Sequence, residues 1–232
     1  MRLSLVIPCY NEAANLPLLL KQCQGLAAMP SVEVILVDNG STDNSPLVLE
    51  QLLPHYPGCS SIRIEHNLGY GHGILEGLRV ARGEILAWTH ADLQADPLDA
   101  IHGLKLFDKF GDDIFVKGRR YGRPFFDVLF TFGMSVFETL LLARPMFDIN
   151  AQPTMFARQF FDNWHNPPND FSLDLYAYYQ AHRYKLKVYR FPVKFGERAH
   201  GTSHWNINWA AKWKFIRRTV SFSLTLRKMS QK

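Results

Sequence analysis

Cysteine is scarce in this sequence, with three residues in a chain of 232: Cys9, Cys23 and Cys59. The count is odd and the spacing matches no metal motif, which argues against a disulfide framework and favours a reducing compartment. No secretory leader is visible, because the first apolar run is strand-like, ends at Pro8 and leads to no small-residue cleavage site. We therefore expect a cytoplasmic protein.

Long hydrophobic runs are lacking too. The most apolar stretch, 128–143, is interrupted by Glu138. Its uncharged part, 128–137, is about half of the roughly 20 residues that a membrane-spanning helix needs, so none is expected. With 47% apolar and 20% charged residues, the composition is that of a globular protein, and the length suits one domain with a full core.

Acidic residues are absent from residues 205–232, which carry a charge of +7, whereas residues 1–204 carry −2. Apolar side chains in this tail recur at helical spacing: Trp205, Trp209, Trp213, Ile216, Val220 and Leu224. Such a basic amphipathic helix either lies at a membrane interface or docks on the domain's own core, and both interpretations stay open. Nucleic acid is not an expected partner, because the rest of the chain is slightly acidic and has no recognisable binding module.

The sequence does contain an alternation of strand and helix patterns. The predicted strands are 3–8, 32–38, 61–65, 84–88, 114–117 and 187–193. Segments with helical spacing of apolar residues separate them, and another helix is expected at 171–180. This order predicts an α/β fold with a mostly parallel sheet, in which ligands bind beyond the carboxyl ends of the strands.

Polar residues cluster where three of these strands end. The clusters are Tyr10-Asn11-Glu12, Asp38-Asn39 and His90-Ala-Asp-Leu-Gln94. Asp92 and Gln94 occupy alternate positions of an extended segment, so both side-chain oxygens face one side and can reach one hard cation. A divalent cation there would neutralise the charge that builds up on a nucleoside diphosphate as its bond to a sugar breaks. The alternative is that Asp92 caps the helix that begins near Pro97.

A basic loop follows the fifth predicted strand and contains Arg119, Arg120 and Arg123. Guanidinium groups in a loop with glycine and proline suit phosphate recognition. A solvated basic loop fits the composition equally well, so the sequence leaves both interpretations open.

Four ordered motifs carry a family resemblance. They are Val6-Ile-Pro-Cys-Tyr-Asn-Glu12, Val37-Asp-Asn-Gly-Ser-Thr-Asp43, the glycine-bearing stretch from Asn67 to Gly83, and Thr89-His-Ala-Asp-Leu-Gln-Ala-Asp-Pro97. Together, over roughly residues 3–204, they resemble the family 2 glycosyltransferases, inverting enzymes of GT-A fold that use nucleotide sugars. The fourth motif is similar to that of the polyprenyl-phosphate sugar transferase branch, which includes dolichyl-phosphate mannose synthase.

The resemblance implies a single GT-A domain over residues 1–204, with a basic helix at 205–232 that is part of it or interfacial. It implies a nucleotide site made of Pro8, Tyr10, Asn11, Glu12, Asp38, Asn39, His90 and Ala91. It also implies that Asp92 and Gln94 hold Mg²⁺ or Mn²⁺. Asp92, Arg120 and Arg198 would be the catalytic groups, with the arginines on the donor diphosphate or the acceptor phosphate. Candidates for the acceptor side are Arg120, Asp148, Asp174 and Ser203.

The chain departs from the family pattern at several positions. His90 stands where the family usually has the first acid of the metal motif, which removes a negative charge and alters metal preference. Asn39 replaces a frequent acid of the base-binding motif, so the donor nucleotide does not follow from it. Thr131 stands where an acceptor-site arginine is expected, and the segment 148–152 lacks the Ser-Gly pattern of the branch.

The resemblance favours transfer of a hexose from a nucleotide sugar to a polyprenyl phosphate at the cytoplasmic membrane face, with peripheral membrane contact through the C-terminal helix. A phosphate acceptor is already anionic, so the reaction needs placement and charge neutralisation more than a base. The alternative acceptor is a sugar hydroxyl of a cell-envelope polysaccharide, which needs a base such as Asp148 or Asp174. A third possibility is a non-catalytic nucleotide-sugar-binding protein, with His90 marking a decayed metal site.

Overall fold

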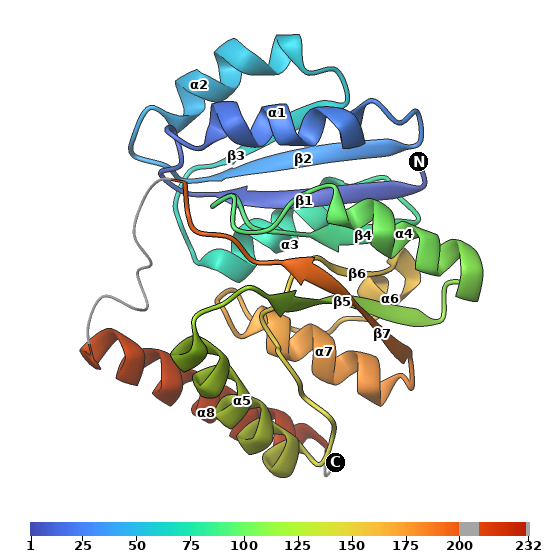
Figure 1. The fold of residues 1–232 in the computed structure, drawn as a ribbon, viewed down its shortest axis with the longest axis vertical. Helices are drawn as coiled ribbons and strands as arrows, with labels where there is room; N and C mark the ends of the chain where they lie inside the picture. The colour runs from blue at the N-terminus through green and yellow to red at the C-terminus, as the bar shows by residue number, and fades with distance from the viewer. Residues whose placement is uncertain (200–208, 231–232) are drawn as a thin grey trace.

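The computed structural model describes residues 1–199 and 209–230, and within the last helix it describes the side chains of 216–228. A seven-stranded sheet in the order β3-β2-β1-β4-β6-β5-β7 runs through its centre (Figure 1). The strands are β1 (Leu3–Cys9), β2 (Val32–Asn39), β3 (Cys59–Ile64), β4 (Ile85–Trp88), β5 (Ile114–Tyr121), β6 (Thr154–Ala157) and β7 (Lys187–Lys194). The α/β fold with a mostly parallel sheet is confirmed.

Helices connect the strands and cover both faces of the sheet (Figure 1). They are α1 (Leu16–Ala27), α2 (Ser45–Leu52), α3 (Tyr70–Val80), α4 (Asp99–Phe110), α5 (Phe125–Leu142), α6 (Arg158–Asp162), α7 (Leu173–Arg183) and α8 (Trp209–Ser230), with a short 3-10 turn at Leu53–His55. The helix expected at 171–180 is α7.

Strand β6 is not among the predicted strands. It runs antiparallel between β4 and β5, where Thr154 pairs with Trp88 on one side and with Lys117 on the other. Its four residues show no period of two and run directly into α6, whereas the equally short β4 is followed by a polar segment. The sequence pattern therefore carries little sign of it.

The core has two layers because the residues of β1 alternate between the faces of the sheet. Leu5 and Ile7 pack with the apolar sides of α1, α2 and α4, whereas Val6 packs with α3 and α7. Since both faces are covered, β1 reads as an almost continuous apolar run. Helix α3 approaches β1 so closely at Gly77 that a Cβ there would lie 2.3 Å from Val6 Cγ1.

The pairing register brings three strand ends to one edge of the sheet. Cys9 at the end of β1 pairs with Asp38 on β2, and Val6 pairs with Trp88 at the end of β4. The polar clusters after these strands therefore meet, although they are far apart in the sequence. This is the edge where a doubly wound fold binds its ligands.

Helices α5 and α8 pack together beside the sheet, below it in Figure 1. Glu138 on α5 is fully buried and accepts a hydrogen bond from Ser223 Oγ on α8 at 2.8 Å, and Leu226 of α8 is buried with the core residues. Of the described helices, α5 is long and apolar enough to cross a membrane by length and composition, with 17% of its residues buried. The uncharged run alone underestimates this length, because the helix also includes Asp127 and Glu138.

Candidate active site

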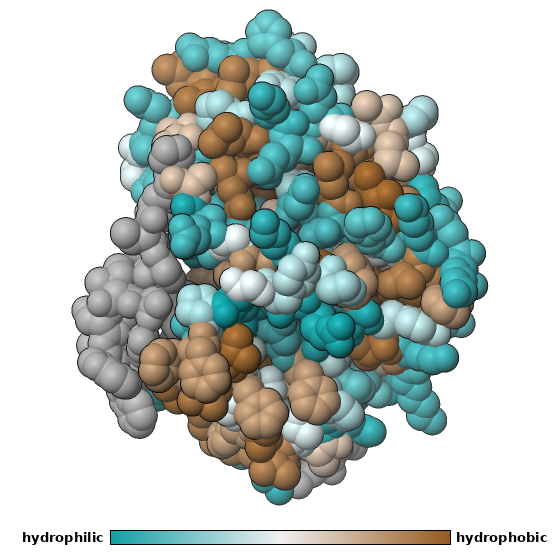
Figure 2. All heavy atoms as spheres, in the orientation of Figure 1, coloured by the Kyte–Doolittle hydropathy of each residue, from teal (hydrophilic) through white to brown (hydrophobic). Residues whose placement is uncertain are grey.

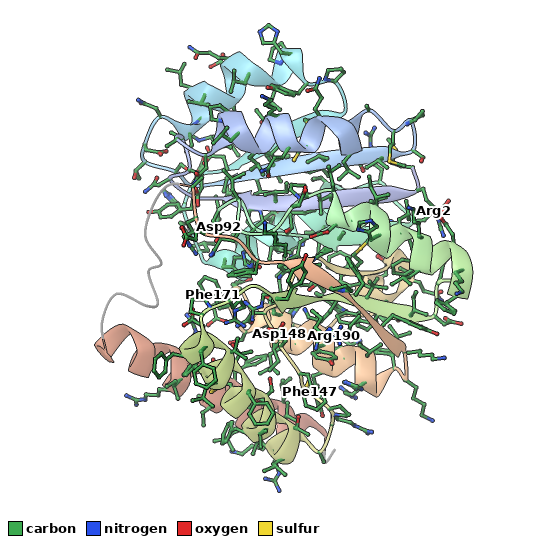
Figure 3. The ribbon with its side chains drawn as sticks, viewed as in Figure 1. Arg2, Asp92, Phe147, Asp148, Phe171 and Arg190 are labelled. Carbon is green, nitrogen blue, oxygen red and sulfur yellow. The ribbon has the colours of Figure 1, made fainter. Side chains whose placement is uncertain are left out.

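The ends of β1, β2 and β4 open into a cavity of about 1070 Å³, which is closed on its other side by residues of α5, by the start of α7 and by the segment after β7. The predicted site residues that line it are Pro8, Tyr10, Asn11, Glu12, Asn39, His90, Ala91, Asp92, Gln94, Arg120, Asp174 and Arg198. Asp38 and Asp148 are not among the residues that line it. Figure 3 shows Asp92 above this region and Asp148 and Phe171 below it. Ser203 lies outside the described residues.

Hydrogen bonds between two loops shape the end of the cavity beside β1 and β2. Asn11, at a left-handed φ of 56°, accepts a hydrogen bond from Thr42 N at 2.8 Å, and its own N–H donates to Ser41 Oγ at 3.0 Å. Asp38 is 2% exposed and accepts from Ser41 N at 3.0 Å. Asp38 therefore stabilises the turn after β2. Asn11 joins the loop after β1 to that turn and itself lines the cavity.

The glycine-rich turn before α3 is tied to the same edge. Asn39 is buried and donates from Nδ2 to Gly69 O at 2.9 Å. Gly69 adopts a φ of 123°, and Gly73 leaves space for Asn39, since a Cβ at Gly73 would lie 3.1 Å from its side chain. The amide of Asn39 thus fixes the glycine turn.

Asp92 and Gln94 converge on one cationic group. Arg198 Nη2 lies 2.9 Å from Asp92 Oδ2, and Arg198 Nε donates to Gln94 Oε1 at 3.2 Å. The two side chains share a side because the segment bends at Leu93, which has a φ of 62°, rather than because it is extended. The alternative role for Asp92 as a helix cap is not observed, since Asp96 accepts from Leu98 N where α4 begins.

This pair of oxygens fits a hard divalent cation. A carboxylate oxygen and an amide oxygen already face the same positive charge, that of Arg198. Magnesium sites commonly combine one or two protein oxygens with substrate phosphates and water. Among the described residues, no group of three or more His, Cys, Asp or Glu side chains is placed to hold a metal. A cation held by Asp92 and Gln94 would therefore take its other ligands from the donor diphosphate and water.

The imidazole ring of His90 lines the cavity in its neutral form. Burial lowers the pKa of His90 below its usual range, and this outweighs the nearby charge of Asp92. The ring stacks on Tyr70 with centroids 5.5 Å apart, and Tyr70 stacks on Phe171 at 4.6 Å. The histidine therefore adds no charge beside Asp92 at neutral pH and continues a row of stacked rings.

Two arginines converge at the other end of the cavity. Arg120 donates from Nε to Asp148 Oδ1 at 2.9 Å, and Arg123 Nη1 lies 3.8 Å from the same oxygen. Both guanidinium groups lie over the ring of Phe195, at 5.2 and 5.6 Å from its centre. Although burial opposes ionisation of Asp148, the charge and hydrogen bonds of Arg120 outweigh it and lower the pKa. The carboxylate of Asp148 thus lies between two guanidinium groups at this end.

Arg123 also reaches the position where the family pattern has an arginine. Its Nη2 donates to Thr131 Oγ1 at 2.9 Å, across the first two turns of α5. Thr131 therefore fixes a guanidinium that comes from the preceding loop. The second positive charge of this end is present, although it is carried by a different residue.

Asp174 lies at the bottom of the cavity with its charge balanced. It is 1% exposed and accepts hydrogen bonds at Oδ1 from Gln152 Nε2 (2.8 Å) and Trp88 Nε1 (3.3 Å), with Lys117 Nζ 3.8 Å away. Burial lowers the pKa of Lys117 to about 8, against the attraction of Asp174. Asp174 and Lys117 form a buried pair that shapes the floor.

Several lining residues are absent from the predicted site: Tyr70, Arg123, Asp127, Phe171 and Phe195. The arginine cluster of the sequence contains Arg123, so that residue had a detectable signal. The aromatic residues had none, because a single ring in a loop or at the first position of a helix is not distinctive. Asp127 escapes notice because its place in the first turn of α5 is typical of a solvated helix start.

The family described as Glycosyl transferase family 2 matches residues 4–148. An undecaprenyl-phosphate 4-deoxy-4-formamido-L-arabinose transferase from Pseudomonas paraeruginosa is 39% identical over 100 residues, which cover 40% of this chain and 29% of that protein. The enzyme of that name from Proteus mirabilis is 38% identical over 101 residues, 41% of this chain and 30% of that protein. The matched segment is thus less than a third of these relatives.

Solved structures share the fold at low identity. Glucosyl-3-phosphoglycerate synthase from Mycobacterium tuberculosis, in complex with Mn²⁺, uridine diphosphate and glucosyl-3-phosphoglycerate, superposes with a TM-score of 0.72 at 18% identity, over 97% of this chain and 79% of that one. A mannosyltransferase from Pyrobaculum calidifontis, in complex with GDP-Man and Mn²⁺, gives a TM-score of 0.65 at 22% identity, over 87% and 58%. Both support the assignment of the fold.

Proposed function

This chain belongs to glycosyl transferase family 2, and on that premise we propose that it transfers a sugar from a nucleotide sugar to a polyprenyl phosphate, with inversion at the anomeric carbon. The observation that carries the choice of acceptor is the state of the two acids expected as bases. Asp148 is paired with Arg120, and Asp174 lies beside Lys117 and accepts hydrogen bonds. A phosphate acceptor needs no base, and the two arginines are placed to bind it.

The chemistry follows from the charges. An oxygen of the acceptor phosphate forms the new bond to the anomeric carbon while the bond from that carbon to the donor diphosphate breaks, and no proton has to move. Arg120 and Arg123 bind the acceptor phosphate and hold its oxygen in line with the breaking bond. Thr131 and Phe195 keep the two guanidinium groups in place.

The donor occupies the edge of the sheet. Its nucleoside lies between the loops that carry Asn11 and Asn39, and its diphosphate lies beside Asp92 and Gln94. A divalent cation, Mg²⁺ or Mn²⁺, neutralises the leaving diphosphate when it is bound there. Arg198 contacts both Asp92 and Gln94, so its guanidinium group would be free to bind the diphosphate if these two residues held the cation.

The relatives support this acceptor. Their names specify undecaprenyl phosphate, and the matched segment includes about two fifths of this chain. A polyprenyl phosphate is anchored in a bilayer, so the enzyme acts as a peripheral protein at the cytoplasmic face. The predicted contact through the basic helix α8 belongs to this proposal.

A glycan acceptor is the second candidate, and one observation favours it. The end of the cavity that carries Arg120 and Arg123 is the acceptor end, and the half-buried carboxyl group of Asp127 also lines it. The side chain of Asp127 accepts no hydrogen bond in the described structure. It is the carboxylate best placed to act as base if the acceptor is a hydroxyl group.

The Asp127→Asn variant separates the two functions. We expect it to retain most of its transfer to polyprenyl phosphate, because the nucleophile there is already an anion. Donor binding, followed by isothermal titration calorimetry, serves as the check that the cavity is intact. Loss of transfer by a factor of 100 or more with normal donor binding would establish Asp127 as a base and overturn the phosphate acceptor.

A further inference from the structure

Helix α5 has an exposed apolar face that runs along its whole length. Among the exposed side chains of this face are Phe125, Phe126, Leu129, Phe132, Val136 and Leu140, of which Phe126 and Leu140 are 80% and 77% exposed. Figure 2 shows apolar side chains gathered at the lower end of the molecule, over α5. Exposed apolar surface of this extent marks a site of interaction, because isolated soluble proteins rarely present it.

The opposite face of α5 is already occupied. Thr131 and Met134 line the cavity, and Glu138 is buried against Ser223 of α8. A helix that crossed the bilayer would have to withdraw these residues from the cavity and from α8. Helix α5 can therefore lie along a membrane surface with its outer face in lipid, but it cannot cross the membrane while this packing is kept.

Basic side chains accompany the apolar face. Arg144 is exposed directly after α5, and the neighbouring α8 exposes Arg217, Arg227 and Lys228. Residues 205–232 contain no acid to offset them. Apolar and basic groups on the same pair of helices match the two layers of an anionic phospholipid surface, the acyl region and the headgroups. This charge complementarity favours a lipid surface over a second copy of the chain, whose basic residues would face one another.

We propose that the outer face of α5 is the element by which this protein binds the surface of an anionic phospholipid bilayer, with α8 supplying the electrostatic attraction. The inference rests on the proposed function and deepens it, because it names the surface that brings the cavity to its lipid substrate. Since the inner face of the same helix lines the acceptor end, a bilayer that holds α5 also lies next to Arg123. The acceptor's phosphate then reaches the cavity while its hydrocarbon chain stays in the membrane.

Flotation of the full chain with vesicles tests the surface. Vesicles of phosphatidylcholine and phosphatidylglycerol are compared with vesicles of phosphatidylcholine alone, for the wild type and for the double variant Phe126→Ser, Leu140→Ser. These two side chains lie near the ends of the face and outside the cavity lining. We expect the partition coefficient on the anionic vesicles to fall at least about tenfold in the variant, and the wild type to bind the neutral vesicles more weakly.

A matched variant controls for the general loss of exposed apolar side chains. Leu47 on α2 and Val80 at the end of α3 are 52% and 50% exposed, so Leu47→Ser, Val80→Ser removes apolar groups away from α5 and is expected to bind as the wild type does. Equal binding by the wild type and the α5 variant would overturn the proposal. A wild-type dimer that the α5 variant dissociates, with vesicle binding unchanged, would also overturn it and assign the face to a second copy.

Failure of this inference is distinguishable from failure of the proposed function. Transfer to a short-chain, water-soluble prenyl phosphate is measured on the same proteins without vesicles. The α5 variant is expected to retain this activity while losing vesicle binding. A wild type that binds anionic vesicles but transfers no sugar would contradict the proposed function and support α5 as the membrane-binding surface. Circular dichroism melts confirm that each variant is folded.

Discussion

Replacement of Glu138 by glutamine gives a stability change whose size follows from the structure. Glu138 is fully buried between α5 and α8, and burial raises its pKa to about 7, although the hydrogen bond from Ser223 partly opposes this. Because the pKa in the folded protein lies above the ordinary value of 4.5, the folded state binds more protons than the unfolded state between these values. Stability therefore falls as the pH rises from about 4.5 to 7 and stays lower above it.

The magnitude comes from the same two pKa values. A pKa of about 7 in place of 4.5 corresponds to about 3 kcal/mol of lost stability once the group is ionised, and only a small part of this is lost at pH 5. The Glu138→Gln variant keeps an oxygen that accepts from Ser223 but carries no charge. We expect it to gain about 2 to 3 kcal/mol more relative to the wild type at pH 8 than at pH 5.

Urea unfolding at the two pH values measures this difference, with circular dichroism as the probe. Glu50→Gln on α2 serves as control, because Glu50 is exposed and its replacement removes the same charge without the burial. Equal effects of Glu138→Gln at pH 5 and pH 8 would contradict a raised pKa of Glu138. They would mean that Glu138 is solvated and that α8 does not pack on α5 as described.

The other predictions concern the cation ligands and the core. Asp92→Asn should lower cation-dependent donor binding by about 100-fold, as measured by calorimetry with and without Mn²⁺, and unchanged binding would contradict its role as ligand. Arg198→Gln should raise the affinity of the donor-free protein for Mn²⁺, because the positive charge of Arg198 no longer occupies the place beside Asp92 and Gln94. Electron paramagnetic resonance measures this affinity, and a weaker affinity in the variant would contradict competition between Arg198 and the cation. Gly77→Ala should destabilise the protein by about 1 to 3 kcal/mol in urea unfolding, because its Cβ would meet Val6, and an unchanged midpoint would show that α3 can shift without cost.

The order of the elements could be predicted from the sequence because its central strands are buried on both faces. β1 and β2 read as short, mostly apolar runs, and the polar residues that follow them identify the binding edge. Strand β6 could not be predicted, since its four residues lead directly into α6, whereas the equally short β4 is followed by a polar segment. Antiparallel insertion of this kind is fixed by tertiary contacts alone.

The candidate site was predictable where a motif places two groups within a few residues. Asp92 and Gln94 do lie on one side, where both contact the guanidinium group of Arg198, although the bend at Leu93 and not the strand pleat turns them together. The acceptor end depends on contacts between separate elements, such as Arg123 with Thr131. No local pattern predicts which arginine reaches a given position, because side chains from the loop and the helix compete for the same space.

The transfer of sugar to polyprenyl phosphate is tested by following radiolabel from a nucleotide sugar into the organic phase. The purified chain is supplied with a panel of labelled nucleotide sugars and Mg²⁺ or Mn²⁺, with and without polyprenyl phosphate. We expect label in the organic phase with at least one donor, only when both the cation and the lipid are present, and none with Asp92→Asn. Donor binding without any lipid-soluble product would contradict the proposal that the acceptor is a polyprenyl phosphate. The absence of donor binding would contradict the assignment as a glycosyltransferase.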